Sequence, residues 1–391
     1  MKIRTGFYVG NGLTNHNIPL NNITPDFIMI KGGNDTAFHS SPGQIWMSSY
    51  APSTTQPITI NVQDGFLNTN VHLDGILSVT ENNMRLGTSI EVNRDTITYD
   101  YLAIEDNGAG DFRVITPYIG DGVDNRVIDA NLDSDIIIVS GENRSPVWLT
   151  KYHLPDTLTP DLTRYRSHGF TSGQGDAPNK LQDFVPPCGF EVGTDASVNS
   201  PVTTYHAVVM KEVTNTIVVR SHLGDGLLRQ LTWGFRPTFV GIKASNSLGS
   251  FIPMALKMAS QVAPSTKSYR IDAFDDQDFE ITSFEDDGCI VTAEGPGGNN
   301  NSFTNISNIN DTGLPGSHIT YVGIFARDND SSLPVDEVAT ARMTQFGIEI
   351  VSDFEDTDIE PPCTTGPDIV PVDTSLCEAP LFSKVGTLRR H

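Results

Sequence analysis

The feature that most constrains this chain of 391 residues is a sequence block that occurs three times. In each copy a strand-like run ends in a glycine-x-glycine turn, and an apolar run opens about fourteen residues after the first glycine. A second block, an apolar residue and asparagine followed by a tyrosine-containing run, recurs in phase with the first. Repeats outweigh other signals when a fold is inferred. The copies are Gly10-Asn11-Gly12 with Val92-Asn93 and Tyr99, Gly120-Asp121-Gly122 with Val198-Asn199 and Tyr205, and Gly224-Asp225-Gly226 with Ile309-Asn310 and Tyr321.

The spacing of these blocks divides the chain into three related modules and a tail. Each unit has a little over one hundred residues, which is too long for one turn of a solenoid and suits a small self-contained domain. We predict modules at residues 1–111, 112–215 and 216–329, followed by a C-terminal segment at 330–391.

The modules are predicted to be all-β. Short runs rich in β-branched and aromatic residues recur at a spacing of roughly 8–12 residues, joined by glycine and asparagine turns, which is typical of antiparallel β-sandwiches. Helical periodicity is missing, and only Pro253–Ala259 could be helical. The polar stretches Ser167–Lys180 and Gly295–Asn301 are expected to be exposed loops.

Composition excludes several classes of protein. The formal charge of −23, from 25 Lys and Arg against 48 Asp and Glu, argues against a nucleic-acid partner, because phosphate binding needs clustered basic residues. The chain contains no run of eighteen apolar residues, so no membrane span is expected. The first residues lead directly into a strand without the apolar core of a signal peptide.

The four cysteines form no CxxC pair and have no histidine at zinc-ligand spacing. Cys188 and Cys289 are expected to be buried free thiols. Cys363 and Cys377 lie in the irregular tail, where free thiols and a disulfide, within or between chains, are both open alternatives.

The C-terminal segment differs in character from the modules. It carries twelve acidic residues against four Lys or Arg, and its prolines favour an extended arm. Its apolar residues are too sparse for a core, so we expect them to anchor the arm on another protein, together with two terminal arginines. These anchoring residues are Val370, Leu376, Leu381, Phe382, Leu388, Arg389 and Arg390.

No motif indicates catalysis, a cofactor or a metal. The glycine-x-glycine turns lack the third glycine and the helix of a dinucleotide-binding loop, so tight turns with glycine at positive φ are favoured. Acidic clusters such as Asp272–Asp278 and Asp353–Asp358 contain oxygen ligands for calcium but lack EF-hand spacing, so solvated loops are preferred. HExxH and GxSxG are absent. We therefore expect a protein that is not an enzyme.

Aromatic residues recur within the modules. Trp46 and Trp148 occupy matching places, and core packing is favoured over sugar-binding platforms. The recurring tyrosines, for which we expect the same, are Tyr99, Tyr101, Tyr205 and Tyr321.

At these residues the chain resembles a recurrent module of tailed-bacteriophage virion proteins. The resemblance covers most of residues 1–329 and none of the tail, and Ser134-Asp135 replaces a proline-aspartate pair in the second copy. It implies jelly-roll or lectin-like sandwiches and a structural protein of the virion. We expect other virion proteins as partners, and we expect the chain to be a homo-oligomer or to occur in several copies per particle. The stretches that carry it are Tyr8-Val9-Gly10-Asn11-Gly12, Pro25-Asp26-Phe27-Ile28, Gly189-Phe190-Glu191-Val192-Gly193, Val198-Asn199 and Tyr205.

Three functions are compatible with this reading. The first is a capsid or tail decoration or connector protein held by its C-terminal arm. The second is a tail-fibre or collar adhesin that binds host glycans, and the third is a polysaccharide depolymerase. Fibres usually show heptads, collagen-like repeats or a β-helix, and this chain shows none, so decoration is ranked first.

Overall fold

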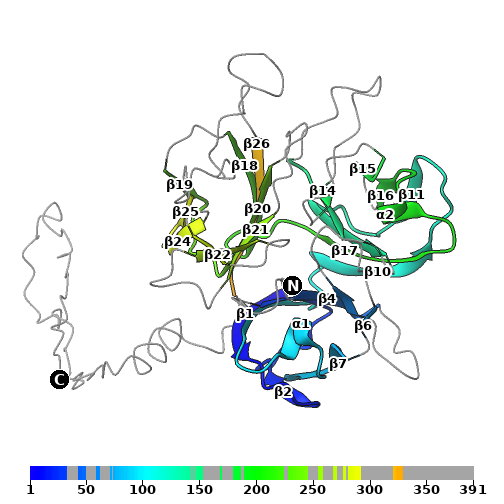
Figure 1. The fold of residues 1–391 in the computed structure, drawn as a ribbon. Helices are drawn as coiled ribbons and strands as arrows, with labels where there is room; N and C mark the ends of the chain where they lie inside the picture. The colour runs from blue at the N-terminus through cyan, green and yellow to red at the C-terminus, as the bar shows by residue number, and fades with distance from the viewer. Residues whose placement is uncertain are drawn as a thin grey trace, which may run out of the picture. The chain divides into compact units, whose positions relative to one another are not determined.

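The computed structural model is an all-β structure in which six antiparallel sheets form three sandwich-like units (Figure 1). The chain divides into two units, the modular body at residues 1–330 and a C-terminal unit at residues 331–391. The anchoring residues, Cys188, Cys363, Cys377 and Gly295–Asn301 lie outside the described residues. The structure describes residues 1–32, 43–49, 59–61, 71–72, 74–141, 144, 146–152, 168–169, 179–185, 189–223, 228–244, 254–258, 267–270, 276–278, 281–291 and 320–328.

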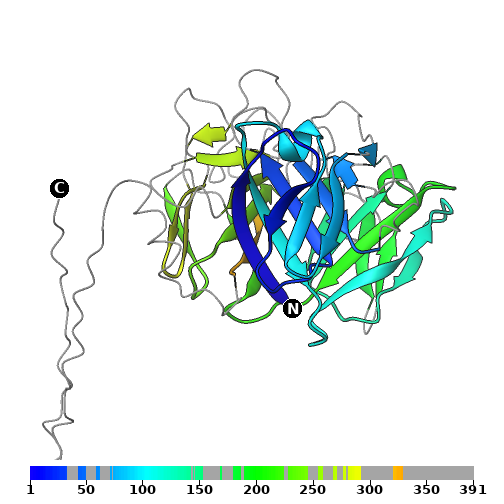
Figure 2. The ribbon, with the colours of Figure 1, turned by 90° about the horizontal axis from the view of Figure 1, so that it is seen from below.

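The first unit pairs a large sheet with a small one. In the large sheet the last strand, β9, lies between the first strand and β3, and Figure 2 shows the long blue β1 beside its neighbours. In spatial order the large sheet contains β1 (Lys2–Val9), β9 (Thr98–Glu105), β3 (Phe27–Gly32), β4 (Gly43–Met47), β5 (Thr59–Asn61) and β6 (Val71–His72). The small sheet contains β2 (His16–Pro19), β8 (Asn83–Leu86) and β7 (Ile76–Thr80), and α1 is Ile90–Asn93.

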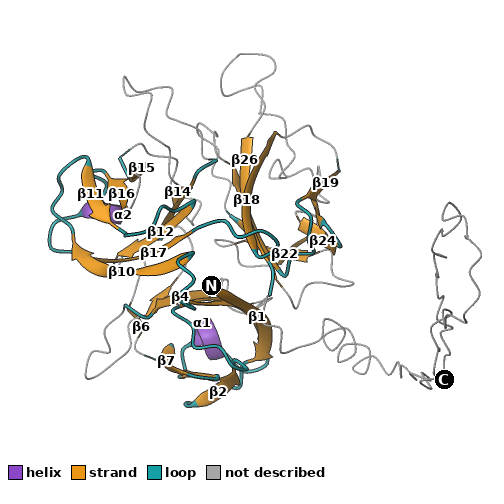
Figure 3. Cartoon of the chain, turned by 180° about the vertical axis from the view of Figure 1, so that it is seen from behind, coloured by secondary structure: helices purple, strands orange, loops and turns teal. Residues whose placement is uncertain are grey.

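The second unit repeats this strand order. Its large sheet contains β10 (Phe112–Ile119), β17 (Thr204–Met210), β12 (Ile136–Gly141), β13 (Val147–Thr150) and β14 (His168–Gly169). Its small sheet contains β11 (Arg126–Asp129), β16 (Gly189–Val192) and β15 (Leu181–Val185), and α2 is Ala196–Asn199. Figure 3 shows α1 and α2 in purple after the equivalent small-sheet strands.

The third unit has the same order again. Its large sheet contains β18 (Ile217–Leu223), β26 (Thr320–Ala326), β20 (Phe239–Ala244), β21 (Ala255–Met258), β22 (Lys267–Arg270) and β23 (Asp276–Asp278). Its small sheet contains β19 (Arg229–Thr232), β25 (Gly288–Val291) and β24 (Ile281–Glu285). Three units with one topology are what the sequence repeat requires.

The central strands of the large sheets are buried on both faces, which explains their runs of consecutive apolar residues, such as Phe27–Ile30 in β3 and Ile136–Val139 in β12. On β3, Ile28 and Ile30 face the small sheet of their own module, whereas Phe27 and Met29 face the opposite way. Successive side chains of a strand point to opposite faces. A strand that packs against apolar side chains on both faces therefore does not show the alternation of apolar and polar residues that is typical of a half-buried strand.

Each module has a private core between its two sheets. Module 1 packs residues such as Ile28 and Met84, module 2 packs Ile137 and Phe190, and module 3 packs Ile242. The private cores satisfy the ordinary requirement of a sandwich, that two sheets bury their inner faces against each other.

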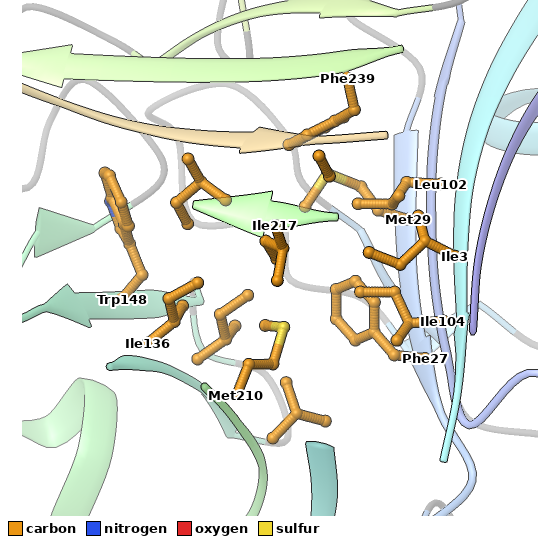
Figure 4. Packing of buried hydrophobic residues seen from close by; sticks show 14 of the residues in the cluster. Ile3, Phe27, Met29, Leu102, Ile104, Ile136, Trp148, Met210, Ile217 and Phe239 are labelled. Carbon is orange, nitrogen blue, oxygen red and sulfur yellow. The ribbon is translucent and has the colours of Figure 1, made fainter. Parts of the chain in front are cut away.

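A fourth cluster is shared by all three modules. The outer faces of the three large sheets contribute to one continuous apolar core, and Figure 4 shows side chains of the three modules directed toward one another. Ile3 and Phe27 come from module 1, Ile136 and Trp148 from module 2, and Ile217 from module 3. The modules are therefore parts of one packed body and not separate beads on a string.

Three predictions about local structure are wrong. Pro253–Ala259 contains the strand β21 and no described helical residue, because the four residues Ala255–Met258 pair with β20 and are all buried. Within Ser167–Lys180, two residues form β14 and Lys180 is buried, so this stretch is not uniformly an exposed loop. Asp276–Asp278, from the first acidic cluster, forms β23 and not a loop.

The two tryptophans do not occupy matching places. Trp46 pairs with Ile28, whereas Trp148 pairs with Ile138, which corresponds to Met29. Trp46 instead corresponds to Leu149, because their cross-strand partners Ile28 and Ile137 are equivalent. The shift of one residue places the two tryptophans on opposite faces of their sheets. Trp148 is fully buried in the shared core, while Trp46 is only partly buried.

Within the described part of the chain, no helix has the length and apolarity needed to cross a membrane.

Candidate interaction surface at the glycine turns

The turn after the first strand of module 1 is organised by Asn93, the last residue of α1, which is fully buried. Its Oδ1 accepts a hydrogen bond from the backbone N–H of Asn11 at 3.0 Å and lies 2.8 Å from Nδ1 of His16. Its Nδ2 donates to the carbonyl oxygens of Leu13 and Gly87, each at 2.7 Å. One amide side chain thus joins the turn, the helix and the end of the small sheet.

Asn199 has the same role in module 2. Its Oδ1 accepts from the backbone N–H of Asp121 at 3.0 Å, and its Nδ2 donates to the carbonyl oxygen of Val123 at 2.8 Å. Nη1 of Arg126 lies 3.4 Å from the same Oδ1, where module 1 has the His16 ring. The asparagine that recurs in the sequence is therefore a structural clamp in both described copies.

The two glycines of each turn are required for different reasons. Gly12 and Gly122 have φ values of +65° and +72°, in the left-handed region that favours glycine. A Cβ on Gly10 or Gly120 would lie 2.0 or 2.1 Å from a carbonyl oxygen just after the short helix. The prediction of tight turns with glycine at positive φ is confirmed for these two copies, and Gly224–Gly226 lies outside the described residues.

Stacked tyrosines close the same end of each module. Tyr8 stacks on Tyr99 at a centroid distance of 5.3 Å, and Tyr118 stacks on Tyr205 at 5.2 Å. The Tyr8 and Tyr118 hydroxyls donate to the carbonyl oxygens of the residues before the clamp asparagines, at 2.7 and 2.8 Å. Burial raises the pKa of Tyr8 and of Tyr118 well above the usual value, so both hydroxyls stay neutral. The expected core packing is confirmed for Tyr99 and Tyr205, which are fully buried.

The exposed side chains around these turns are apolar at equivalent positions. Val9 and Leu13 flank the first turn and are 53% and 66% exposed, and Ile119 and Val123 flank the second and are 63% and 58% exposed. Leu228, immediately before β19 of the third module, is also 66% exposed, but it corresponds to Asn15 and Asn125 and not to these flanks. The apolar flanks of the first two turns are the candidate interaction surface of the modular body.

The acidic side chain of the second turn is hydrogen-bonded within the turn. Asp121 is the acidic member of the second turn, and a hydrogen bond from the backbone N–H of Val123 is the main cause that lowers the pKa of its carboxyl group. Arg126 also lies 3.3 Å from this carboxylate. Because the polar atoms of the turn are engaged with one another, the cluster supports the fold and presents the apolar flanks.

The described residues contain no group of three or more His, Cys, Asp or Glu that could hold a metal ion. Cys289 is a buried free thiol, as predicted, and burial raises its pKa far above the usual value. The exposed flanks were not anticipated from the sequence. The signal that could have revealed them is the apolar residue on each side of every glycine-x-glycine turn.

Comparison of the chain with protein-family models and with curated proteins found no match.

Proposed function

We propose that this chain is a structural protein of a bacteriophage virion, a decoration or connector protein of the capsid or tail. The modular body occupies space on the particle, and the C-terminal segment at 330–391 binds neighbouring subunits. The exposed apolar flanks of the glycine turns supply further contacts with other virion proteins.

The observation that carries this proposal is that the repeated motif serves the module's own fold. The motif makes contacts inside its own module, through Asn93, Asn199 and the turn glycines. Each repeat of the motif therefore adds another folded module and no new reactive centre. A protein that fills and covers a surface gains from such repetition. The resemblance of the modules to those of phage virion proteins gives the class of particle.

Charge supports a partner other than the body itself for the C-terminal segment. The segment has twelve acidic residues against four Lys or Arg, and the rest of the chain also carries more acids than bases. Two acidic surfaces repel each other at low ionic strength. The anchoring residues, including Leu381 and Phe382, are therefore proposed to bind a less acidic neighbouring subunit.

Quantitative mass spectrometry of purified particles tests this function. Decoration predicts many copies of the chain per particle, in proportion to the major capsid or tail protein. A handful of copies would favour the adhesin that binds host glycans, and absence of the chain from purified particles would contradict a virion role.

A further inference from the structure

The chain leaves each of the three modules through an equivalent acidic residue. The last strands are aligned by the residue that pairs with the first position of the central strand, which is Ile104, Met210 or Ala326. Two positions later in each module stands the acidic residue, Asp106, Glu212 or Asp328. Its backbone N–H donates to the side chain that precedes the central strand, at 2.9 Å in modules 1 and 3 and at 2.8 Å in module 2.

The carboxylate of Glu212 joins module 2 to module 3. Its Oε1 accepts a hydrogen bond from the backbone N–H of Val219 in β18 at 2.6 Å, and Nη1 of Arg220 donates to the same oxygen at 2.7 Å. Nζ of Lys151 is bonded to the other carboxylate oxygen. Because β18 is an edge strand, the Val219 N–H lies on the open side of its sheet. Glu212 and Val219 are only seven positions apart, so this contact follows directly from the short link between consecutive modules.

The carboxylate of Asp328 makes the same contact between the last module and the first. Its Oδ2 accepts from the backbone N–H of Thr5 in the edge strand β1 at 3.2 Å, across 323 positions of the chain. Thr5 and Val219 are equivalent, because each lies two positions after the residue that pairs with Ile104 or Ala326. Both are buried, as expected for edge positions that another module covers.

The charge of Asp328 also acts on the interior of module 1. Burial is the main cause that raises the pKa of Tyr101, the guanidinium of Arg4 lowers it, and the carboxylate of Asp328 raises it further. Tyr101 belongs to the private core of module 1. The end of module 3 therefore lies close to module 1 at both the strand edge and this tyrosine.

We propose that Asp328 is a clasp that fastens the end of module 3 to the edge strand of module 1. It joins the first and last modules as Glu212 joins two consecutive ones, by a hydrogen bond to a charged acceptor, which is stronger than one between neutral groups. The clasp also occupies a backbone N–H of β1 that would otherwise be open to strand pairing with another chain. Asp106 is the exception, because its Oδ1 accepts from the backbone N–H of Gly108 in its own link at 2.9 Å.

A double-mutant cycle on the full chain tests the clasp. Asp328→Ala removes the acceptor, and Thr5→Pro removes the donor, since proline has no backbone N–H and is tolerated where an edge strand faces away from its sheet. Each variant alone should raise the unfolding equilibrium constant in urea. The double variant should lose less stability than the two changes summed, with a non-additivity between about 2-fold and 150-fold in that constant, the range for residues in contact.

Asp106→Ala is the matched control, because it removes the equivalent carboxylate from a contact inside its own link. Combined with Thr5→Pro, it should be additive within about 2-fold. Hydrogen exchange of the peptide that contains β1, followed by mass spectrometry, needs no proline variant. Exchange should be about 5-fold faster in Asp328→Ala, the equivalent of one hydrogen bond, and unchanged in Asp106→Ala. An additive cycle for Asp328 and Thr5, or equal exchange of β1 in the two alanine variants, would overturn the proposal.

Discussion

At the scale of single residues, the clamp asparagine holds several segments of its module together through the hydrogen bonds of one side chain. Asn93 makes four polar contacts with backbone or side-chain partners in a fully buried position. Leaving buried partners unsatisfied costs more than the net value of the hydrogen bonds themselves. The sequence position that first indicated a repeat is thus also one of the most demanding positions of the fold.

Asn93→Ala should lower the free energy of unfolding by about 2–5 kcal/mol, since several buried groups lose their partner together. Urea unfolding measured by circular dichroism gives the value. Asn17→Ala, an exposed position on β2, is the control and should change stability by less than about 0.5 kcal/mol. Equal effects of the two substitutions would show that the clamp contributes nothing.

His206 gives a residue-scale prediction about pH. It is buried at the contact with Ser49 of module 1, and burial lowers its pKa from 6.5 to about 4. The unfolded chain therefore takes up this proton first. The stability that depends on neutral His206 is present above pH 6.5 and is lost as the pH falls from 6.5 toward 4.

His206→Gln, which stays neutral, should remove this part of the acid sensitivity. Between pH 7 and pH 5 the wild-type chain should lose about 2 kcal/mol more stability than the variant. Urea unfolding at the two pH values measures the difference. An identical loss in both proteins would mean that His206 titrates normally in the folded state.

At the scale of elements, the glycine turn is fixed by close backbone approach. Gly10→Ala would place a Cβ 2.0 Å from a carbonyl oxygen, so the turn must shift, at a cost of about 3 kcal/mol or more. Gly108 has a φ of +76° but open space around it, and Gly108→Ala should cost only about 1 kcal/mol. Thermal unfolding compares the two, and a larger effect at Gly108 would contradict the steric account.

The element scale also shows what the sequence could predict. Turn residues and strand composition act locally, so the all-β class, the sandwich units and the glycine turns followed from the repeat. The register of the fourth strand did not, because Trp46 and Trp148 differ by one residue and only cross-strand pairing reveals their faces. The short run Ala255–Met258 fits either a buried helix or a buried strand by its sequence pattern, and its pairing with β20 makes it a strand.

The candidate surface was predicted less well than the fold. Asn93 and Asn199 were recognised as repeated residues, but their clamp geometry depends on contacts between segments about 80 positions apart in the chain. The shared core was missed for a related reason. Burial on the outer face of a sheet depends on a neighbouring module, which no local pattern can report.

At the scale of the whole molecule, the C-terminal segment and the body have separable roles. Deleting Glu360–His391 should leave the unfolding temperature of the body within about 2 °C of the wild type, because the body ends at Asp330. The proposed function predicts that the truncated chain is no longer incorporated into particles. Mass spectrometry of particles assembled with the truncated chain checks this, and incorporation at wild-type levels would refute the anchoring role.

The central claim is that three copies of one β-domain pack as a single body around a shared core. Differential scanning calorimetry of the full chain tests it most directly, through the ratio of the calorimetric to the van 't Hoff enthalpy of unfolding. One body predicts a single transition with a ratio of about 1. Three independently unfolding modules would give a ratio of about 3, or separate transitions, and would contradict the claim.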